Sequence, residues 1–78
     1  MDASQIAEHM EIVGSCGNHV GTVDHVEGQM IKLTKSDSPD GRHKYLPLTA
    51  VASVDGGKVK THMNHMAALE LLTDQPPA

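Results

Sequence analysis

One stretch holds much of the reactive chemistry of this 78-residue chain. Residues 15–28, SCGNHVGTVDHVEG, contain one thiol, two imidazoles and two carboxylates. Thiolate and imidazole are the ligands that zinc prefers, and imidazole also suits nickel. A second pair of histidines, His62 and His65, is spaced so that both rings would share one face of a helix. Together with Cys16 and His19 they form a candidate site for zinc or nickel.

The same residues also have a plainer interpretation, in which they only shape the chain. The spacing of the four candidate ligands matches no established zinc pattern, and the site would form only if the turn at Cys16 met the C-terminal segment in space. We therefore expect a turn with solvated histidines and keep the metal site as an alternative.

A carboxylate and imidazole group suggests acid–base chemistry. Asp24, His25 and Glu27 lie close in sequence, and a carboxylate can orient a histidine. Adjacent residues of a strand point to opposite faces, so Asp24 and His25 should not meet. The chain also lacks a GxSxG elbow, a phosphate loop and an HExxH motif. We expect a protein that is not an enzyme, with no catalytic residue and no bound cofactor.

The composition limits the core. Phe and Trp are absent and Tyr45 is the only aromatic residue, so Val, Ile, Leu, Met and Ala must fill a single domain over residues 1–78. A domain of this size buries only about 60% of the surface of its unfolded chain. Self-association, as a homodimer, would add the apolar burial that such a core lacks.

Cysteine usage and the lack of apolar runs indicate a compartment. Cys16 is the only cysteine, which excludes an internal disulfide and is typical of a reducing environment. Neither a secretory signal nor an apolar run of about 20 residues is evident. We expect a cytoplasmic protein with no membrane span.

The charge is unevenly distributed. The chain carries a formal net charge of -4, which argues against general nucleic-acid binding. All six basic residues nevertheless fall between residues 32 and 60, where only three acids occur. Lys35, Arg42 and Lys44 flank or lie within the loop SDSPDGR and are candidate contacts for an acidic protein partner. A second alternative is an RNA- or ribosome-associated module that uses this patch.

Turn signals recur at residues 14–18, 27–29, 36–42 and 55–58, which is the pattern of a small all-β fold with hairpins. We expect strands at MIKLT (30–34), HKYLPL (43–48), VASVD (51–55) and KVK (58–60). HVGTVDHVEG (19–28) departs from alternation and predicts a bent or bulged strand, with Gly21 at the bend. Pro47 predicts an edge strand or a strand end.

The C-terminal segment is the best helix candidate. THMNHMAALELL predicts a helix over about residues 61–73, with Thr61 or Asn64 as N-cap, followed by a frayed tail over 74–78. Met63, Met66, Leu69 and Leu72 recur every three residues and would pack against the sheet or against a partner.

Two segments, GNHVGTVDHVEG and LTKSDSPDGRHKYLPL, carry a resemblance to a family. Over about residues 6–60 the chain resembles the small bacterial PRC-barrel-like domains of unknown function, related to the barrel of the photosynthetic reaction centre H subunit. The resemblance implies a six-stranded antiparallel β-barrel, here followed by a short C-terminal α-helix, and implies no activity. At Cys16 the resembled pattern has a polar turn residue such as Asp, so the thiol is particular to this chain.

These observations predict a mainly β, PRC-barrel-like domain that acts as a binding or assembly module. We expect it to recognise a protein partner or a second copy of itself. The candidate contacts are the three basic residues of the loop region and the apolar residues Met63, Met66 and Leu69.

Overall fold

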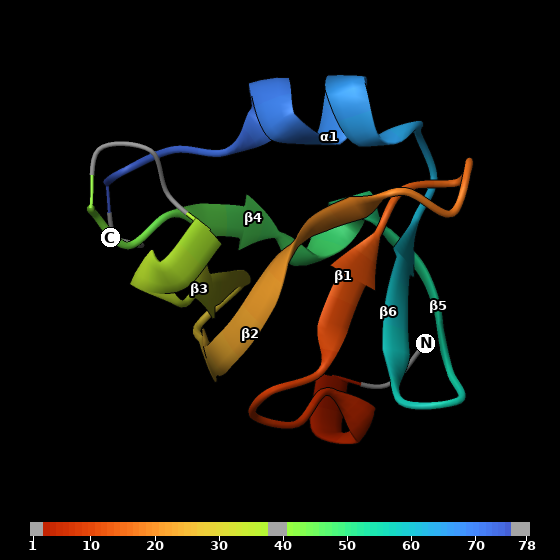
Figure 1. Ribbon diagram of the computed structural model, residues 1–78. Helices are drawn as coiled ribbons and strands as arrows, with labels where there is room; N and C mark the ends of the chain where they lie inside the picture. Colours follow the sequence, from red (N-terminus) through yellow and green to blue (C-terminus); the bar gives the residue numbers. More distant parts are fainter. Residues whose placement is uncertain (1–2, 38–40, 76–78) are drawn as a thin grey trace.

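Six strands, three single 3-10 turns and one helix make up the regular structure of residues 3–37 and 41–75, the part of the chain that the computed structural model describes (Figure 1). The strands are β1 (Glu11–Val13), β2 (His19–Glu27), β3 (Met30–Leu33), β4 (Tyr45–Pro47), β5 (Val51–Asp55) and β6 (Lys58–Thr61). The turns are η1 (Ala3–Gln5), η2 (Lys35–Asp37) and η3 (Leu48–Ala50), and the helix is α1 (His65–Leu71). The predicted mainly β fold with six strands and a C-terminal helix is confirmed.

The strands form one open, mixed sheet in the order β4-β3-β2-β1-β6-β5. Neighbouring pairs are antiparallel except β1 and β6, which run parallel. The prediction of a closed, purely antiparallel barrel is therefore wrong. Strands β4 and β5 are the two edges of the sheet, and a closed barrel would need a ladder of hydrogen bonds between them. The turn η3 connects these two strands in sequence, and they do not pair. Pro47 ends β4 without an N–H to donate.

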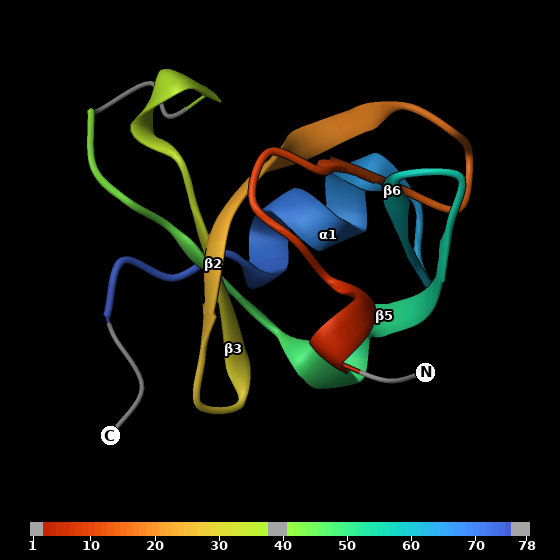
Figure 2. The same cartoon turned by 90° about the horizontal axis from the view of Figure 1, so that it is seen from below.

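The long strand β2 bends the sheet, because it pairs with β1 along one part and with β3 along the other (Figures 1 and 2). The register shifts twice, beside Val20 and beside Asp24, which are the β-bulges of a strongly curved strand. Gly21 lies between the two shifts and packs against Leu33, whose Cδ2 atom would lie 2.4 Å from an added Cβ. The predicted bent strand with Gly21 near the bend is confirmed.

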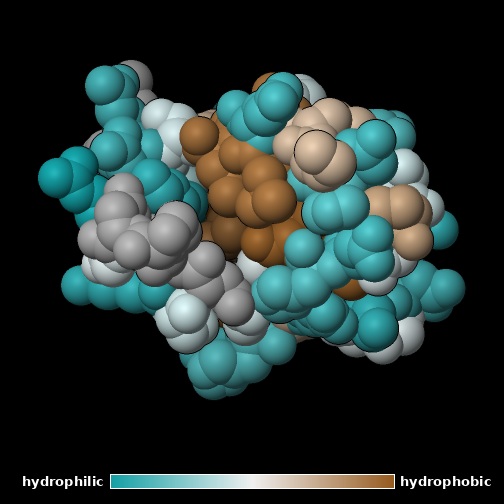
Figure 3. Space-filling model, turned by 45° about the horizontal axis from the view of Figure 1, so that its top comes forward, coloured by the Kyte–Doolittle hydropathy of each residue, from teal (hydrophilic) through white to brown (hydrophobic). Residues whose placement is uncertain are grey.

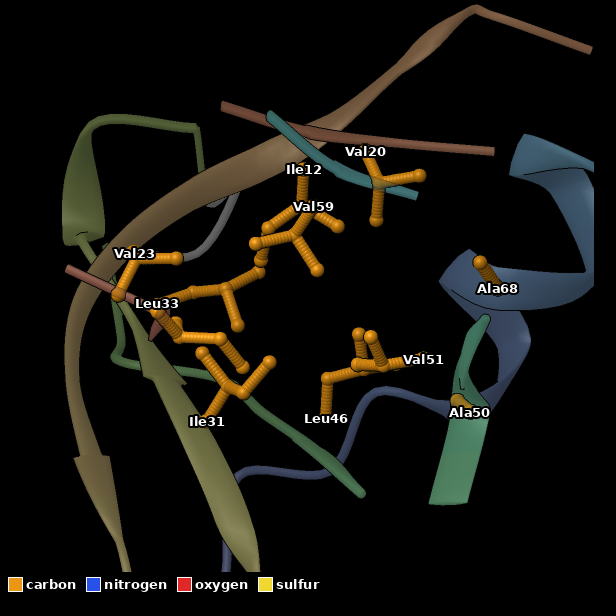
Figure 4. Close-up of a cluster of buried hydrophobic side chains, with 11 residues drawn as sticks. Ile12, Val20, Val23, Ile31, Leu33, Leu46, Ala50, Val51, Val59 and Ala68 are labelled. Carbon is orange, nitrogen blue, oxygen red and sulfur yellow. The ribbon is translucent and has the colours of Figure 1, made fainter. Parts of the chain in front are cut away.

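The core lies inside the curve of the sheet. Ile12, Val23, Ile31, Leu46 and Val59 are fully buried and come from five different strands. Figure 4 shows their side chains converging with those of Leu33 and Val51. Tyr45 is the one buried aromatic residue of the described chain, and the rest of the core is made of aliphatic side chains from every strand, as the composition predicts.

The helix α1 lies across one end of the bent sheet and contacts β2 and β4 (Figures 1 and 2). It is shorter than the predicted span 61–73. Thr61 is a buried residue of β6, and Asn64 is the N-cap, with its side-chain oxygen accepting a hydrogen bond from the N–H of Ala67 at 2.9 Å. The helix ends at Leu71 because Leu72 is extended and Thr73 pairs with Tyr45 of β4.

The start of the predicted frayed tail is tied to the sheet. Tyr45 and Thr73 exchange backbone hydrogen bonds of 2.7 and 3.1 Å, and Arg42 donates to the Asp74 carboxylate at 3.1 Å. Residues 76–78 of that tail, residues 38–40 of the 35–44 loop, and residues 1–2 lie outside the described part of the chain. Within the described part, no helix is both long and apolar enough to cross a membrane.

Candidate functional site

The turn after β1 meets the start of α1, although Cys16 in the turn and His65 in the helix are 49 residues apart in sequence. Gly14 makes this approach possible: an added Cβ there would lie 2.3 Å from the backbone nitrogen of His65. The N–H of Ser15 donates to the carbonyl of Met63 at 2.8 Å, and the Thr61 hydroxyl donates to the same carbonyl at 2.7 Å. Backbone contacts therefore fix the junction of turn and helix.

This junction brings Cys16 beside His65. The Cys16 Sγ atom lies 3.2 Å from His65 Nδ1 and accepts a hydrogen bond from the His65 backbone N–H at 3.4 Å. The Asn18 side-chain amide lies 3.3 Å from the same ring nitrogen. Cys16 and Asn18 are exposed and His65 is half-buried. A thiol and an imidazole within hydrogen-bond distance are the arrangement of an activated nucleophile.

The surroundings of Cys16 favour its thiolate. The backbone N–H of His65 has the largest effect, followed by the backbone N–H of Asn18 and the His65 ring, and together they lower the pKa of the Cys16 thiol to about 6. Hydrogen bonds donated to the charged form explain this direction, since they stabilise the anion relative to the neutral thiol. The lowered pKa favours the thiolate form of this exposed sulfur near neutral pH.

The other two predicted metal ligands lie elsewhere. The His19 ring bonds to the Glu11 carboxylate at 2.9 Å across β1 and β2, and His62 is exposed on the connection between β6 and α1. Across residues 3–37 and 41–75, no three His, Cys, Asp or Glu side chains are placed to share a metal ion. The turn at Cys16 and the C-terminal segment do meet, but their contact brings together only Cys16 and His65 of the four predicted ligands. The zinc or nickel site therefore stays a prediction.

The Glu11 carboxylate contacts side chains from both neighbouring strands. It contacts His19 and, at 3.3 Å, the Lys58 ammonium of β6. His19 first and then Lys58 hold the pKa of the Glu11 carboxyl below its ordinary value. These contacts tie β1 to both of its neighbours in the sheet, which is a structural role for His19.

The expectation that Asp24 and His25 stay apart is wrong. His25 Nδ1 lies 3.8 Å from the Asp24 carboxylate, and its Nε2 lies 3.0 Å from that of Glu27. The cause is the bulge at Asp24, which interrupts the alternation of the strand. His43 lies 3.8 Å from the other Asp24 oxygen, and its Nδ1–H donates to the Leu33 carbonyl at 2.8 Å. Sequence reasoning had omitted His43 from this group.

The three predicted basic contacts all lie on the connection from β3 to β4, in different surroundings. Lys35 is exposed on η2, Arg42 pairs with Asp74, and Lys44 is half-buried at the start of β4, where its carbonyl accepts from Leu33. The RNA- or ribosome-associated role stays a prediction. A separate hollow of about 330 Å³ lies over β1, β5 and β6 and reaches the turn at Gly17; its lining is Val13, Gly17, Ser53, Asp55, Lys58 and Lys60.

The predicted apolar contacts divide into a packed and an exposed pair. Met63 and Leu72 pack against the core. Met66 is 66% exposed and Leu69 45% exposed, and both lie on the outer face of α1. Figure 3, which looks toward the α1 side, shows apolar residues gathered into one patch with hydrophilic residues around it.

The chain was compared with known proteins. A family model described as an uncharacterised protein conserved in bacteria (DUF2171) matches residues 6–68. The match covers the sheet and the first half of α1, and it does not connect the family to the PRC-barrel proteins. No curated protein matches the chain, and no solved structure matches it.

Proposed function

We propose that this chain, which belongs to the uncharacterised bacterial family DUF2171, is a non-enzymatic assembly module that pairs with a second copy through the outer face of α1. The exposure of Met66 and Leu69 supports this proposal most directly. Residues three apart on a helix are neighbours, so these two side chains form one apolar surface.

The exposed pair interrupts a stripe that is otherwise packed. Met63 before the helix and Leu72 after it both contact the core, while Met66 and Leu69 between them face outward. On the opposite side of the helix, Ala68 is fully buried against the sheet. Covering a large apolar side chain is worth about 1.5–3 kcal/mol, so two such residues give a partner a usable contact. A flexible Met suits such a surface.

A second copy fits this surface better than a charged partner does. The helix HMAALEL carries a single carboxylate, Glu70, and no Lys or Arg. A two-fold contact centred between Met66 and Leu69 would place apolar atoms of one copy on those of the other. It would also supplement the thin aliphatic core. A contact limited to one seven-residue helix is small, so we expect a weak dimer whose population rises with concentration.

Sedimentation equilibrium from low micromolar to millimolar protein tests the proposal. We expect the wild type to shift from monomer to dimer and the Met66→Gln, Leu69→Gln double variant to stay monomeric. Leu71→Gln is the matched control, because it removes an exposed leucine that a helix turns about 160° away from Leu69. A wild type that stays monomeric at every concentration would contradict the proposal. An equal loss of dimer in the double variant and in the control would contradict it too.

A further inference from the structure

The edge strand β5 offers a second contact surface, one that does not require the dimer. We propose that β5 accepts an extended peptide as an additional strand, and that this peptide carries an acidic residue opposite Ser53 and a basic residue opposite Asp55. Three observations support it: β5 is the open edge of the sheet, a hollow lies beside it, and the charges around that hollow are separated.

The two edges of the sheet differ in how far they are closed. At the β4 edge, Tyr45 exchanges backbone hydrogen bonds with Thr73, and Pro47 has no N–H to donate. At the β5 edge, no strand of the described chain pairs with the outer side, and Figure 1 shows this side facing away from the sheet. β5 also lacks Pro and Lys, the residues that often block an edge. Its backbone is therefore a template on which a further strand can form.

One face of this edge carries polar side chains. Ser53 lies opposite Lys60 in the sheet register, and Asp55 lies opposite Lys58. Directly opposed residues share a face of the sheet, and all four of these line the hollow over β1, β5 and β6. Because Ser53 is small and exposed, a side chain of an added strand can reach across it toward the ammonium of Lys60.

The charges of this face are separated along the strand. Lys58 contacts the Glu11 carboxylate at 3.3 Å and lies opposite Asp55, so its charge is matched. The Lys60 ammonium, by contrast, has no ion pair or hydrogen bond within the part of the chain that the structure describes. An acidic side chain opposite Ser53 would pair with Lys60, whereas Asp55 would repel an acid and attract a base. The edge therefore favours a strand with opposite charges two residues apart.

A peptide suits this edge better than a second β5 or a nucleic acid. β5 carries the carboxylate of Asp55 and no base, so a second copy could not supply the basic residue. A phosphate backbone would bring negative charge to Glu11 and Asp55 as well as to Lys60. The register shift beside Ala52 leaves a short regular edge, so we expect weak binding.

An NMR titration of the full chain tests the proposal, with the synthetic peptide acetyl-Thr-Val-Glu-Val-Lys-Val-Thr-amide as the probe. Its Glu and Lys share one face of a strand. We expect saturable shifts at the amides of β5 and at Lys60, and no binding of the same peptide methylated at its backbone nitrogens. Equal binding of the two peptides would overturn the proposal, as would shifts confined to α1 or no saturation at millimolar peptide.

A double-mutant cycle tests the assignment of charge. Lys60→Gln should weaken binding of the probe by about twofold to fivefold, the range of an exposed charge pair, and should not change binding of a peptide with Gln in place of Glu. Lys35→Gln, which removes an exposed lysine on η2, is the matched control and should bind both peptides as the wild type does.

The absence of coupling between Lys60 and the Glu of the probe would overturn the assignment of an acidic residue opposite Ser53. A uridine oligonucleotide that shifts the amides of β5 at a lower concentration than the peptide would overturn the peptide in favour of a nucleic acid.

Discussion

The start of α1 and its outer face lie within one helical turn of each other, yet different interactions define them. At the start, a glycine without a side chain, two bonds to one carbonyl and an N-cap hold the turn after β1 against the helix. On the outer face, Met66 and Leu69 extend away from the sheet. The fold therefore brings Cys16 and His65 together through backbone contacts, while it leaves the apolar side chains of the outer face exposed.

The largest effect is expected at the junction, from Gly14→Ala. Because the added Cβ would meet the backbone of Asn64 and His65, the turn and the helix must separate, at a cost of about 3 kcal/mol in the free energy of unfolding. Urea unfolding measures this, with Ser15→Ala as the neighbouring control. If Gly14→Ala were as stable as the control, the close approach would not define the junction.

The buried side of α1 should respond next. Ala68→Leu adds three carbons where the side chain is fully buried, and overpacking of this kind costs about 2 kcal/mol. Leu69→Ala, one residue along, should change the stability of the monomer by less than about 0.5 kcal/mol, since surface substitutions usually do. Thermal and urea unfolding at low protein concentration measure the stability of each variant. Similar losses of stability in both variants would show that the buried and outer faces of α1 do not differ in packing.

The N-cap should give a smaller effect. Asn64→Ala removes the acceptor for the Ala67 N–H and should destabilise the protein by about 1 kcal/mol, whereas Asn64→Asp keeps an acceptor. A stability equal to that of the wild type would show that the cap is not needed.

The smallest effect is a dependence of stability on pH, because Cys16 is exposed and solvent screens its charge. Because the folded protein lowers the pKa of Cys16 to about 6, the thiolate stabilises the fold above the unfolded pKa of about 8.5, and this contribution is lost as the pH falls through 6. The melting temperature of the wild type should therefore rise from pH 6 to pH 9 relative to Cys16→Ser. Parallel curves for the two proteins would contradict a lowered pKa.

The sequence predicted the elements well because their signals are local. Alternation in MIKLT, the turn glycines and Pro47 each act within a few residues, and β3, the hairpins and the end of β4 follow from them. The parallel contact of β1 and β6 depends instead on where η3 directs the chain after Pro47. No pattern within one strand encodes that direction, so the antiparallel barrel was the natural but incorrect expectation.

The site was only partly predictable for a similar reason. Cys16 and His65 both stood out by residue type, but Cys16 was paired with His19 on spacing alone. The residue that Cys16 contacts is His65, which lies 49 residues further along the chain. The sequence feature that permits this contact is Gly14, because it lets the two backbones approach. The contact of Asp24 with His25 was missed because a bulge suspends the alternation that sequence reasoning assumes.

An isotope-filtered NOE experiment on a mixture of labelled and unlabelled protein at high concentration tests directly whether the outer face of α1 contacts a second copy. We predict contacts between copies at the methyl groups of Met66 and Leu69. Contacts confined to the edge strand β5, or no contacts in a sample that sedimentation shows to be dimeric, would contradict the claim.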